Sequence, residues 1–158
     1  YRIDITAKVN RRSKRKPIID TKIDEAVALV KVFPGMDPRI IDMLIDMNYH
    51  GIVIEAYGAG NLPIMENSLI PSIRSAVDSG VFVVISTQCV FGRAWADIYE
   101  TGKLALEAGA IPSYDMISET ALVKLMWVLG HTKSPRKVRE MMHKNYAGEI
   151  TAPGMKLL

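Results

Sequence analysis

Two apolar segments of this chain end in small polar residues of the kind that bind ligands. Residues 51–55 (Gly-Ile-Val-Ile-Glu) lead into a glycine-rich loop that ends at Asn61, and residues 81–85 (Val-Phe-Val-Val-Ile) lead into Thr87 and Cys89. Carboxamides and hydroxyls both donate and accept hydrogen bonds, so these groups could hold a small polar ligand. In an open parallel sheet, ligands bind beyond the carboxyl ends of the strands. The pattern predicts a ligand site there, with an ordinary turn between strand and helix as the alternative.

Two glycine-containing segments resemble phosphate-binding loops, but neither has the required spacing. Gly58-x-Gly60 lacks the third glycine of a dinucleotide fingerprint and runs into Pro63, and residues 101–103 (Thr-Gly-Lys) lack the upstream glycine of a P-loop. The single cysteine excludes an internal disulfide framework, and the three histidines have no metal-ligand spacing with it. We therefore expect no cofactor and no metal ion.

The composition is that of one globular domain. Of the 158 residues, 49% are apolar and 23% are charged, which is enough to form a sizeable core. No apolar run approaches the roughly 20 residues needed to span a bilayer, and the start of the chain lacks the apolar stretch of a signal peptide. We expect a cytoplasmic protein with no membrane partner. Because the chain begins with Tyr1 rather than methionine, we also expect a piece of a longer protein.

Positive charge is concentrated at the start of the chain. The whole chain carries +3 and residues 1–25, with eight Lys or Arg against four acids, carry +4, so the rest sums to −1. The basic run at residues 11–16 has no interleaved aromatic residue, which favours a solvated linker over a nucleic-acid site. Residues 3–9 alternate in polarity like a strand. We assign residues 1–25 to a linker or to a remnant strand of a preceding domain, and expect no nucleic-acid binding by the body.

Strand and helix patterns alternate along residues 26–158 and predict an α/β fold. Asp37 before Pro38 marks the start of a helix, and Gly80 marks the end of another. We expect a three-layer αβα sandwich with a small parallel sheet of three to four strands, similar to flavodoxin and Rossmann folds. The predicted strands are residues 27–32, 51–55, 81–85 and, more weakly, 110–112; the predicted helices start near residues 38, 68, 98, 118 and 134.

Five short motifs occur in an order that matches a known enzyme family. Over about residues 26–152, the chain resembles the C-terminal domain of the cytoplasmic (type I) asparaginases, especially the archaeal ones. The D subunit of the archaeal glutamyl-tRNA(Gln) amidotransferase is a close relative within the same family. The motifs are Glu55-Ala-Tyr-Gly-Ala-Gly-Asn61, Ser86-Thr-Gln-Cys89, Tyr99-x-x-Gly102 with Ala108-Gly109-x-Ile111-Pro112-x-x-Asp115-Met116, Leu122-x-Lys124-Leu125-Met126-Trp127, and Gly148-Glu149-Ile150.

The resemblance implies a two-domain homodimeric amidohydrolase that converts asparagine and water to aspartate and ammonia. In this family a larger N-terminal domain supplies the threonine nucleophiles, and the C-terminal domain helps to close the active site of the neighbouring subunit. None of those nucleophile motifs occurs in this chain. We therefore expect no catalytic residue here, a partner domain that precedes these residues, and no activity from the fragment alone.

The resemblance also assigns site residues. Tyr57, Gly60 and Asn61 match positions that face the substrate, and Thr87 and Cys89 match positions that bind an effector in some bacterial enzymes. From the residues alone, Asn61 is equally suited to capping its own loop, and Cys89 is more simply a small buried hydrophobe.

Two departures from the family pattern affect these assignments. Trp95 replaces a polar residue, so a polar contact is missing or replaced by packing. Glu55 replaces an effector-binding arginine, and its carboxylate would repel the carboxylate of an amino acid. We also expect Lys124 to pair with Glu119 or Glu149.

Three functional hypotheses follow from the sequence. The first is the C-terminal domain of an asparaginase, which the loop at residues 57–61 favours. The second is the equivalent domain of the amidotransferase's D subunit, which releases ammonia from glutamine for a partner; the basic run leaves open that this linker lies near tRNA. The third is a stand-alone domain that binds a small amino acid.

Overall fold

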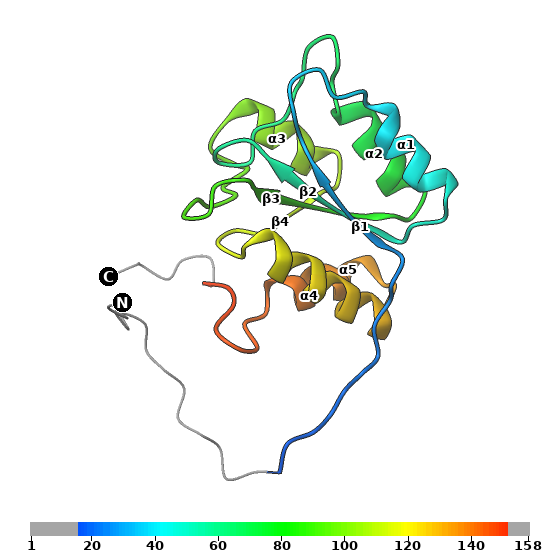
Figure 1. The fold of residues 1–158 in the computed structure, drawn as a ribbon, viewed down its shortest axis with the longest axis vertical. Coiled ribbons are helices and arrows are strands. Elements are labelled where there is room, and N and C mark those ends of the chain that lie inside the picture. The colour runs from blue at the N-terminus through cyan, green and yellow to red at the C-terminus, as the bar shows by residue number, and fades with distance from the viewer. Residues whose placement is uncertain (1–15, 152–158) are drawn as a thin grey trace.

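A four-stranded parallel sheet lies between two layers of helices in the computed structural model, which describes residues 16–151 (Figure 1). The strands are hydrogen-bonded in the order β1-β2-β3-β4, and all three pairings are parallel. This arrangement confirms the three-layer sandwich and the fourth strand. The strands are β1 (Val27–Lys31), β2 (Gly51–Ala56), β3 (Phe82–Thr87) and β4 (Ile111–Pro112).

Three helices cover one face of the sheet and two cover the other (Figure 1). Because the strand order is sequential, each crossover moves one strand further in the same direction. The order therefore lacks the reversal that creates a crevice in flavodoxin-like sheets. On one face lie α1 (Arg39–Asp46), α2 (Ile70–Asp78) and α3 (Glu100–Glu107), and on the other lie α4 (Ser118–His131) and α5 (Pro135–His143).

Alternate side chains of β2 enter two separate hydrophobic cores. Ile52 and Ile54 pack with the first three helices, whereas Val53 packs with α4 and α5. All three side chains are completely buried. Burial on both faces explains why the strand is a continuous apolar run without polar alternation, as is usual in parallel sheets.

The predicted helix boundaries are close to those observed. α1 begins at Arg39, one residue after Pro38, and the carboxylate of Asp37 accepts the backbone N–H of Arg39 at 2.9 Å. α3 is shorter than predicted, because Tyr99 is extended and the helix begins only at Glu100. Within the helix Gly102 and Ala105 are buried.

Two irregular segments pack against α4. The backbone N–H of Asp24 donates to the carbonyl of Met126 at 2.9 Å, and a Cβ on Gly130 would lie 2.6 Å from the carbonyl oxygen of Lys22. On another side of the helix, the buried Lys124 donates to Glu149 at 2.6 Å, which confirms one of the two predicted pairings. The lack of a side chain at Gly130 allows the segment that precedes β1 to approach α4.

The expected strand at residues 3–9 and most of the basic run lie outside the described residues. Residues 16–25 form neither a helix nor a strand, and the assignment of residues 1–25 to a linker stays a prediction. Within residues 16–151, every helix is too short or too polar to cross a bilayer.

Candidate functional site

The loop that follows β2 is closed by its own backbone. The N–H of Tyr57 donates to the carbonyl of Asn61 at 2.9 Å, and the N–H of Asn61 donates back at 2.8 Å. Gly58 and Gly60 have φ angles of +48° and +102°, which side-chain-bearing residues adopt only with strain. Gly60 is also buried, and a Cβ there would lie 3.5 Å from that of Ala96. The glycines therefore permit a tight loop that holds Asn61 beyond the end of β2.

A threonine on α3 fixes the carboxamide of Asn61. The Thr101 hydroxyl donates to Oδ1 of Asn61 at 2.8 Å, so the carbonyl end of the amide is already occupied. Its Nδ2 group makes no hydrogen bond with the described residues and keeps two donors for a ligand. The sequence does not identify Thr101 as a partner, because residues 101–103 resemble only an incomplete P-loop. No spacing rule connects positions 40 residues apart.

The side chain of Tyr57 turns inward. It packs against the core shared by α1, α2 and α3, and its hydroxyl is buried without a hydrogen-bond partner in the described part of the chain. Tyr57 and Gly60 are thus brought next to Asn61 through the backbone of the loop, while the tyrosine hydroxyl is directed into the core.

Thr87 joins the end of β3 to the loop after β2. Its buried hydroxyl donates to the carbonyl of Gly58 at 2.5 Å and accepts the N–H of Cys89 at 3.1 Å. The side chain of Gln88 likewise donates to the carbonyls of Val32 and Glu55. These bonds connect the carboxyl ends of three strands, so this edge of the sheet is preorganised.

Cys89 is exposed, so its interpretation as a small buried hydrophobe is wrong. The chain leaves the sheet after Thr87 and turns at Gly92, whose N–H donates to the carbonyl of Cys89 at 2.9 Å. The residue therefore lies beyond the end of the buried strand rather than within it. An apolar residue type alone does not show where a strand ends.

The predicted effector residues line a common cavity of about 180 Å³. Thr87 and Cys89 meet Glu55 there, and Ser118 and Glu119 are added by the first turn of α4. The sequence does not reveal the two α4 residues as part of this site, because their neighbours at the end of β3 lie about 30 positions earlier in the chain. Within the described part of the chain, the lining includes two carboxylates and no basic side chain, a combination that disfavours the carboxylate of an amino acid.

Trp95 supplies packing at the position where the family pattern has a polar residue. Its ring meets Tyr114 edge to face with centroids 5.8 Å apart, and the guanidinium of Arg93 lies 6.0 Å from its centroid. The packing at Trp95 is therefore observed, and the loss of a polar contact there stays a prediction. Across residues 16–151, no three His, Cys, Asp or Glu side chains gather into a potential metal site.

Comparison with known proteins defines the class of this domain. Residues 26–142 match the glutaminase/asparaginase C-terminal domain family. The match covers more than half of the chain and includes the loop of Asn61 and the end of β3. The chain belongs to the glutaminase/asparaginase C-terminal domain family.

The relatives include both kinds of enzyme suggested by the sequence motifs. The D subunit of the glutamyl-tRNA(Gln) amidotransferase of Pyrococcus abyssi is 54% identical over 141 residues, which are 89% of this chain and 32% of that protein. The thermostable L-asparaginase from Thermococcus kodakarensis has a TM-score of 0.83 at 37% identity, over 91% of this chain and 43% of that one. L-asparaginase I from Vibrio cholerae has a TM-score of 0.79 at 28% identity, with the same coverage. The chain thus spans about a third of the length of the amidotransferase relatives.

Proposed function

We propose that this chain is the C-terminal domain of a cytoplasmic L-asparaginase, an enzyme that hydrolyses asparagine to aspartate and ammonia. Its own role is to complete a site whose nucleophiles lie in a preceding domain. The hydrogen bond from Thr101 to Oδ1 of Asn61 carries this proposal. This hydrogen bond fixes the orientation of the Asn61 carboxamide and leaves its N–H groups free of protein partners among the described residues. A residue that positions substrate needs both properties.

Asn61 would bind substrate rather than react with it. A carboxamide side chain neither accepts a proton near neutral pH nor attacks a carbonyl, but its N–H groups can donate to the substrate's carboxylate or carbonyl oxygen. A hydrogen bond to a charged group contributes about 1.5–3 kcal/mol. Tyr57 and Gly60 would act through the backbone that shapes the loop.

The experiment joins this chain to the preceding part of a relative, which would supply the nucleophiles. The matching C-terminal third of the Pyrococcus abyssi relative is replaced by this chain, and ammonia release from asparagine and glutamine is measured. The fused protein should be active and the isolated chain inactive. Ammonia release by residues 1–158 alone would contradict the proposal.

A substitution in the fused protein tests Asn61 directly. Asn61→Ala should lower kcat/KM about tenfold or more, which corresponds to about 1.4 kcal/mol of transition-state stabilisation. Asn67→Ala, at an exposed asparagine of the same connection, is the matched control and should leave kcat/KM unchanged. An unchanged kcat/KM for Asn61→Ala would leave Asn61 with a structural role in its loop.

The second candidate is the corresponding domain of an amidotransferase of the same family that releases ammonia from glutamine. The 54% identity to the Pyrococcus abyssi protein favours it. A parallel fusion to the N-terminal part of the Thermococcus kodakarensis asparaginase separates the two candidates. Higher activity in the fusion to the amidotransferase relative, with glutamine preferred, would support the second candidate.

The asparaginase proposal includes a homodimer in which Asn61 faces the active site of the neighbouring subunit. Exposed apolar side chains on and beside α4, including Ile117 and Val123, provide surface for association. Sedimentation of the isolated chain at micromolar concentrations should show self-association. A monomer at every concentration would remove the basis for a role of Asn61 across subunits.

A further inference from the structure

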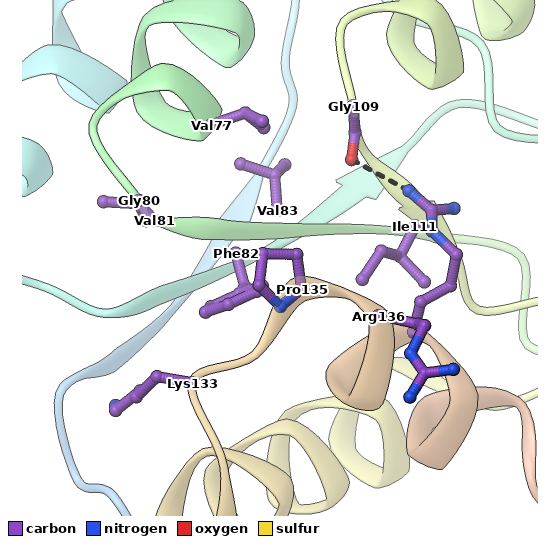
Figure 2. A pocket seen from close by; sticks show the side chains of 11 residues that line it. Val77, Gly80, Val81, Phe82, Val83, Gly109, Ile111, Lys133, Pro135 and Arg136 are labelled. Carbon is purple, nitrogen blue, oxygen red and sulfur yellow. Dashed lines mark hydrogen bonds between the residues drawn. The ribbon is translucent and has the colours of Figure 1, made fainter.

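A second hollow lies at the opposite edge of the sheet. Its volume is about 270 Å³, and the first residues of β3 and β4, Phe82 and Ile111, form part of its lining (Figure 2). Because the strands are parallel, their amino ends lie together at this side of the sheet, whereas Asn61 follows the carboxyl end of β2. The hollow is therefore separate from the site described above.

Three basic side chains line this hollow, and they differ in how strongly they already interact with other groups of the protein. Lys133 is paired with Asp24, and Arg139 donates a long hydrogen bond of 3.3 Å to the carbonyl of Gly109. Arg136 is exposed and has no hydrogen bond or ion pair with the described residues. Among the described residues, no acid contributes to the lining. Arg136 thus keeps a guanidinium whose fork of N–H donors matches a phosphate group.

The wall between these cations is apolar. Phe82 and Pro135 both line the hollow, and in the view of Figure 2 their rings overlap, with Lys133 to one side and Arg136 to the other. An aromatic face next to a cation is the arrangement that proteins use to hold a base and its phosphate together. The volume lies just below the roughly 300–1,000 Å³ of typical small-molecule sites, so it suits one nucleotide rather than a dinucleotide.

The overall charge balance conceals how basic this region is. Residues 133–144 contain five Lys or Arg and one acid, although everything after residue 25 sums to −1. Apart from the buried side of α5, formed by Val138 and Met142, these residues are mostly exposed. Net charge alone therefore does not decide whether this surface binds nucleic acid, because positive charge is segregated on it.

We propose that this hollow binds a nucleotide unit, with the phosphate on Arg136 and Arg139 and the base against Phe82 and Pro135. The unit can come from a free mononucleotide or from single-stranded RNA, since both present the same base and phosphate. The site rests on residues that take no part in the proposed amide hydrolysis.

Fluorescence anisotropy of the 158-residue chain with a labelled 12-nucleotide oligouridylate tests the site. The double variant R136Q/R139Q should weaken binding at least tenfold at low salt, and the slope of log affinity against log salt should fall by about 1.4, or about 0.7 for each lost phosphate contact. The matched double variant K31Q/K103Q removes two exposed charges elsewhere and should change affinity less than twofold. Equal losses in both double variants would overturn the proposal.

A pair of phenylalanine variants tests the stacking contact independently of charge. Phe82→Leu keeps an apolar wall but removes the ring, and should weaken binding by about fivefold or more. Phe91→Leu, at a fully exposed ring away from the hollow, should have no effect. Equal affinities for the two variants would show that no base stacks on Phe82 and would contradict the assignment.

Two further arms identify the source of the nucleotide and exclude the basic run. Displacement of the RNA by uridine monophosphate would indicate a free nucleotide, and displacement only by unlabelled RNA would indicate a strand; both outcomes support the site. A variant with residues 11, 12, 14 and 15 changed to glutamine should still bind. Loss of binding there, with none in R136Q/R139Q, would place the interaction on the basic run and overturn the proposal.

Discussion

The two faces of the sheet are bounded in different ways. Beneath α1, α2 and α3 the apolar core ends at the neutral hydrogen bonds of the Asn61 loop, such as that with Thr101. Beneath α4 and α5 a second apolar core is bordered by ion pairs, in which Lys124 meets Glu149 and Lys133 meets Asp24.

The difference predicts how each face responds to its surroundings. Packing and neutral hydrogen bonds depend little on pH and salt, whereas ion pairs depend on both. The candidate substrate loop should therefore keep its shape over a wide pH range. The segments that border α4 should respond to acid before the loop does.

Gly102→Ala should have the largest effect, because it forces a methyl group into the packed contact between α3 and residue 96. The new Cβ would lie 2.3 Å from the carbonyl oxygen of Ala96, so α3 or its neighbour must move. We expect a loss of about 1–3 kcal/mol in the free energy of unfolding. The sign is informative, since the same change in an unconstrained helix stabilises it by up to about 1 kcal/mol.

Urea unfolding of the isolated chain measures this effect. Glu107→Ala, at an exposed position of the same helix, should leave the free energy of unfolding nearly unchanged. A stability gain for Gly102→Ala would mean that α3 is free to shift, and the fixed position of Thr101 against Asn61 would then be wrong.

Glu149→Gln tests the charged border. Burial alone would raise the pKa of Glu149, but hydrogen bonds from Lys124 and from the backbone of Ala147 and Tyr146 outweigh it and lower the pKa to about 2. The ionised carboxylate thus stabilises the folded state above its unfolded pKa of about 4.3, and this contribution is lost as the pH falls toward 2. We expect a loss of about 1–2 kcal/mol at pH 7, since partial solvent access screens the pair.

Thermal melts at several pH values provide the measurement. The gap in melting temperature between the natural chain and Glu149→Gln should be widest near neutral pH and should close between about pH 4.3 and 2. Glu140→Gln, at an exposed glutamate of α5, is the control. A gap that stays constant across this range would show that the carboxylate contributes packing rather than charge.

The arrangement of elements could be predicted because it depends on local signals. The apolar run of β2, the Asp37-Pro38 start of α1 and the positive φ of Gly80 after α2 each act within a few residues. The site could be predicted only in part. Asn61 follows directly from the end of its strand, but Thr101 and Ser118 reach the site through tertiary contacts that have no sequence spacing.

Cys89 and Arg136 show why the remainder could not be predicted. The exposure of Cys89 depends on where the chain leaves β3, which its apolar character does not reveal. Arg136 lines a hollow built from β3, β4 and α5. The net charge of the chain hides its contribution, because the positive charge of Arg136 is summed with that of distant acids. In both cases the deciding quantity is a position in the fold rather than a residue type.

Thr101→Val should lower activity by a smaller amount, because it removes only one neutral hydrogen bond at the Asn61 loop. The substitution keeps the shape of the side chain but removes the donor to Oδ1 of Asn61. In the fused enzyme, kcat/KM should fall about fivefold, which corresponds to roughly 1 kcal/mol for a neutral hydrogen bond. Thr101→Ser should restore most of the activity. A loss equal to that of Asn61→Ala would indicate that Thr101 itself contacts substrate.

Lys133→Gln should have the smallest effect, because its ion pair with Asp24 is half open to water. The Lys133 side chain is 50% exposed, and Asp24 keeps a second partner in His50 at 2.8 Å. We expect a loss of about 0.5 kcal/mol in the free energy of unfolding at low salt, which vanishes near 1 M salt. Lys137→Gln, at an exposed lysine of the helix that follows, α5, is the control. Because Asp24 already occupies Lys133, this variant should also weaken oligouridylate binding less than Arg136→Gln does. An equal or greater loss of RNA affinity would mean that the ion pair opens for the ligand, and that both ends of the hollow bind phosphate.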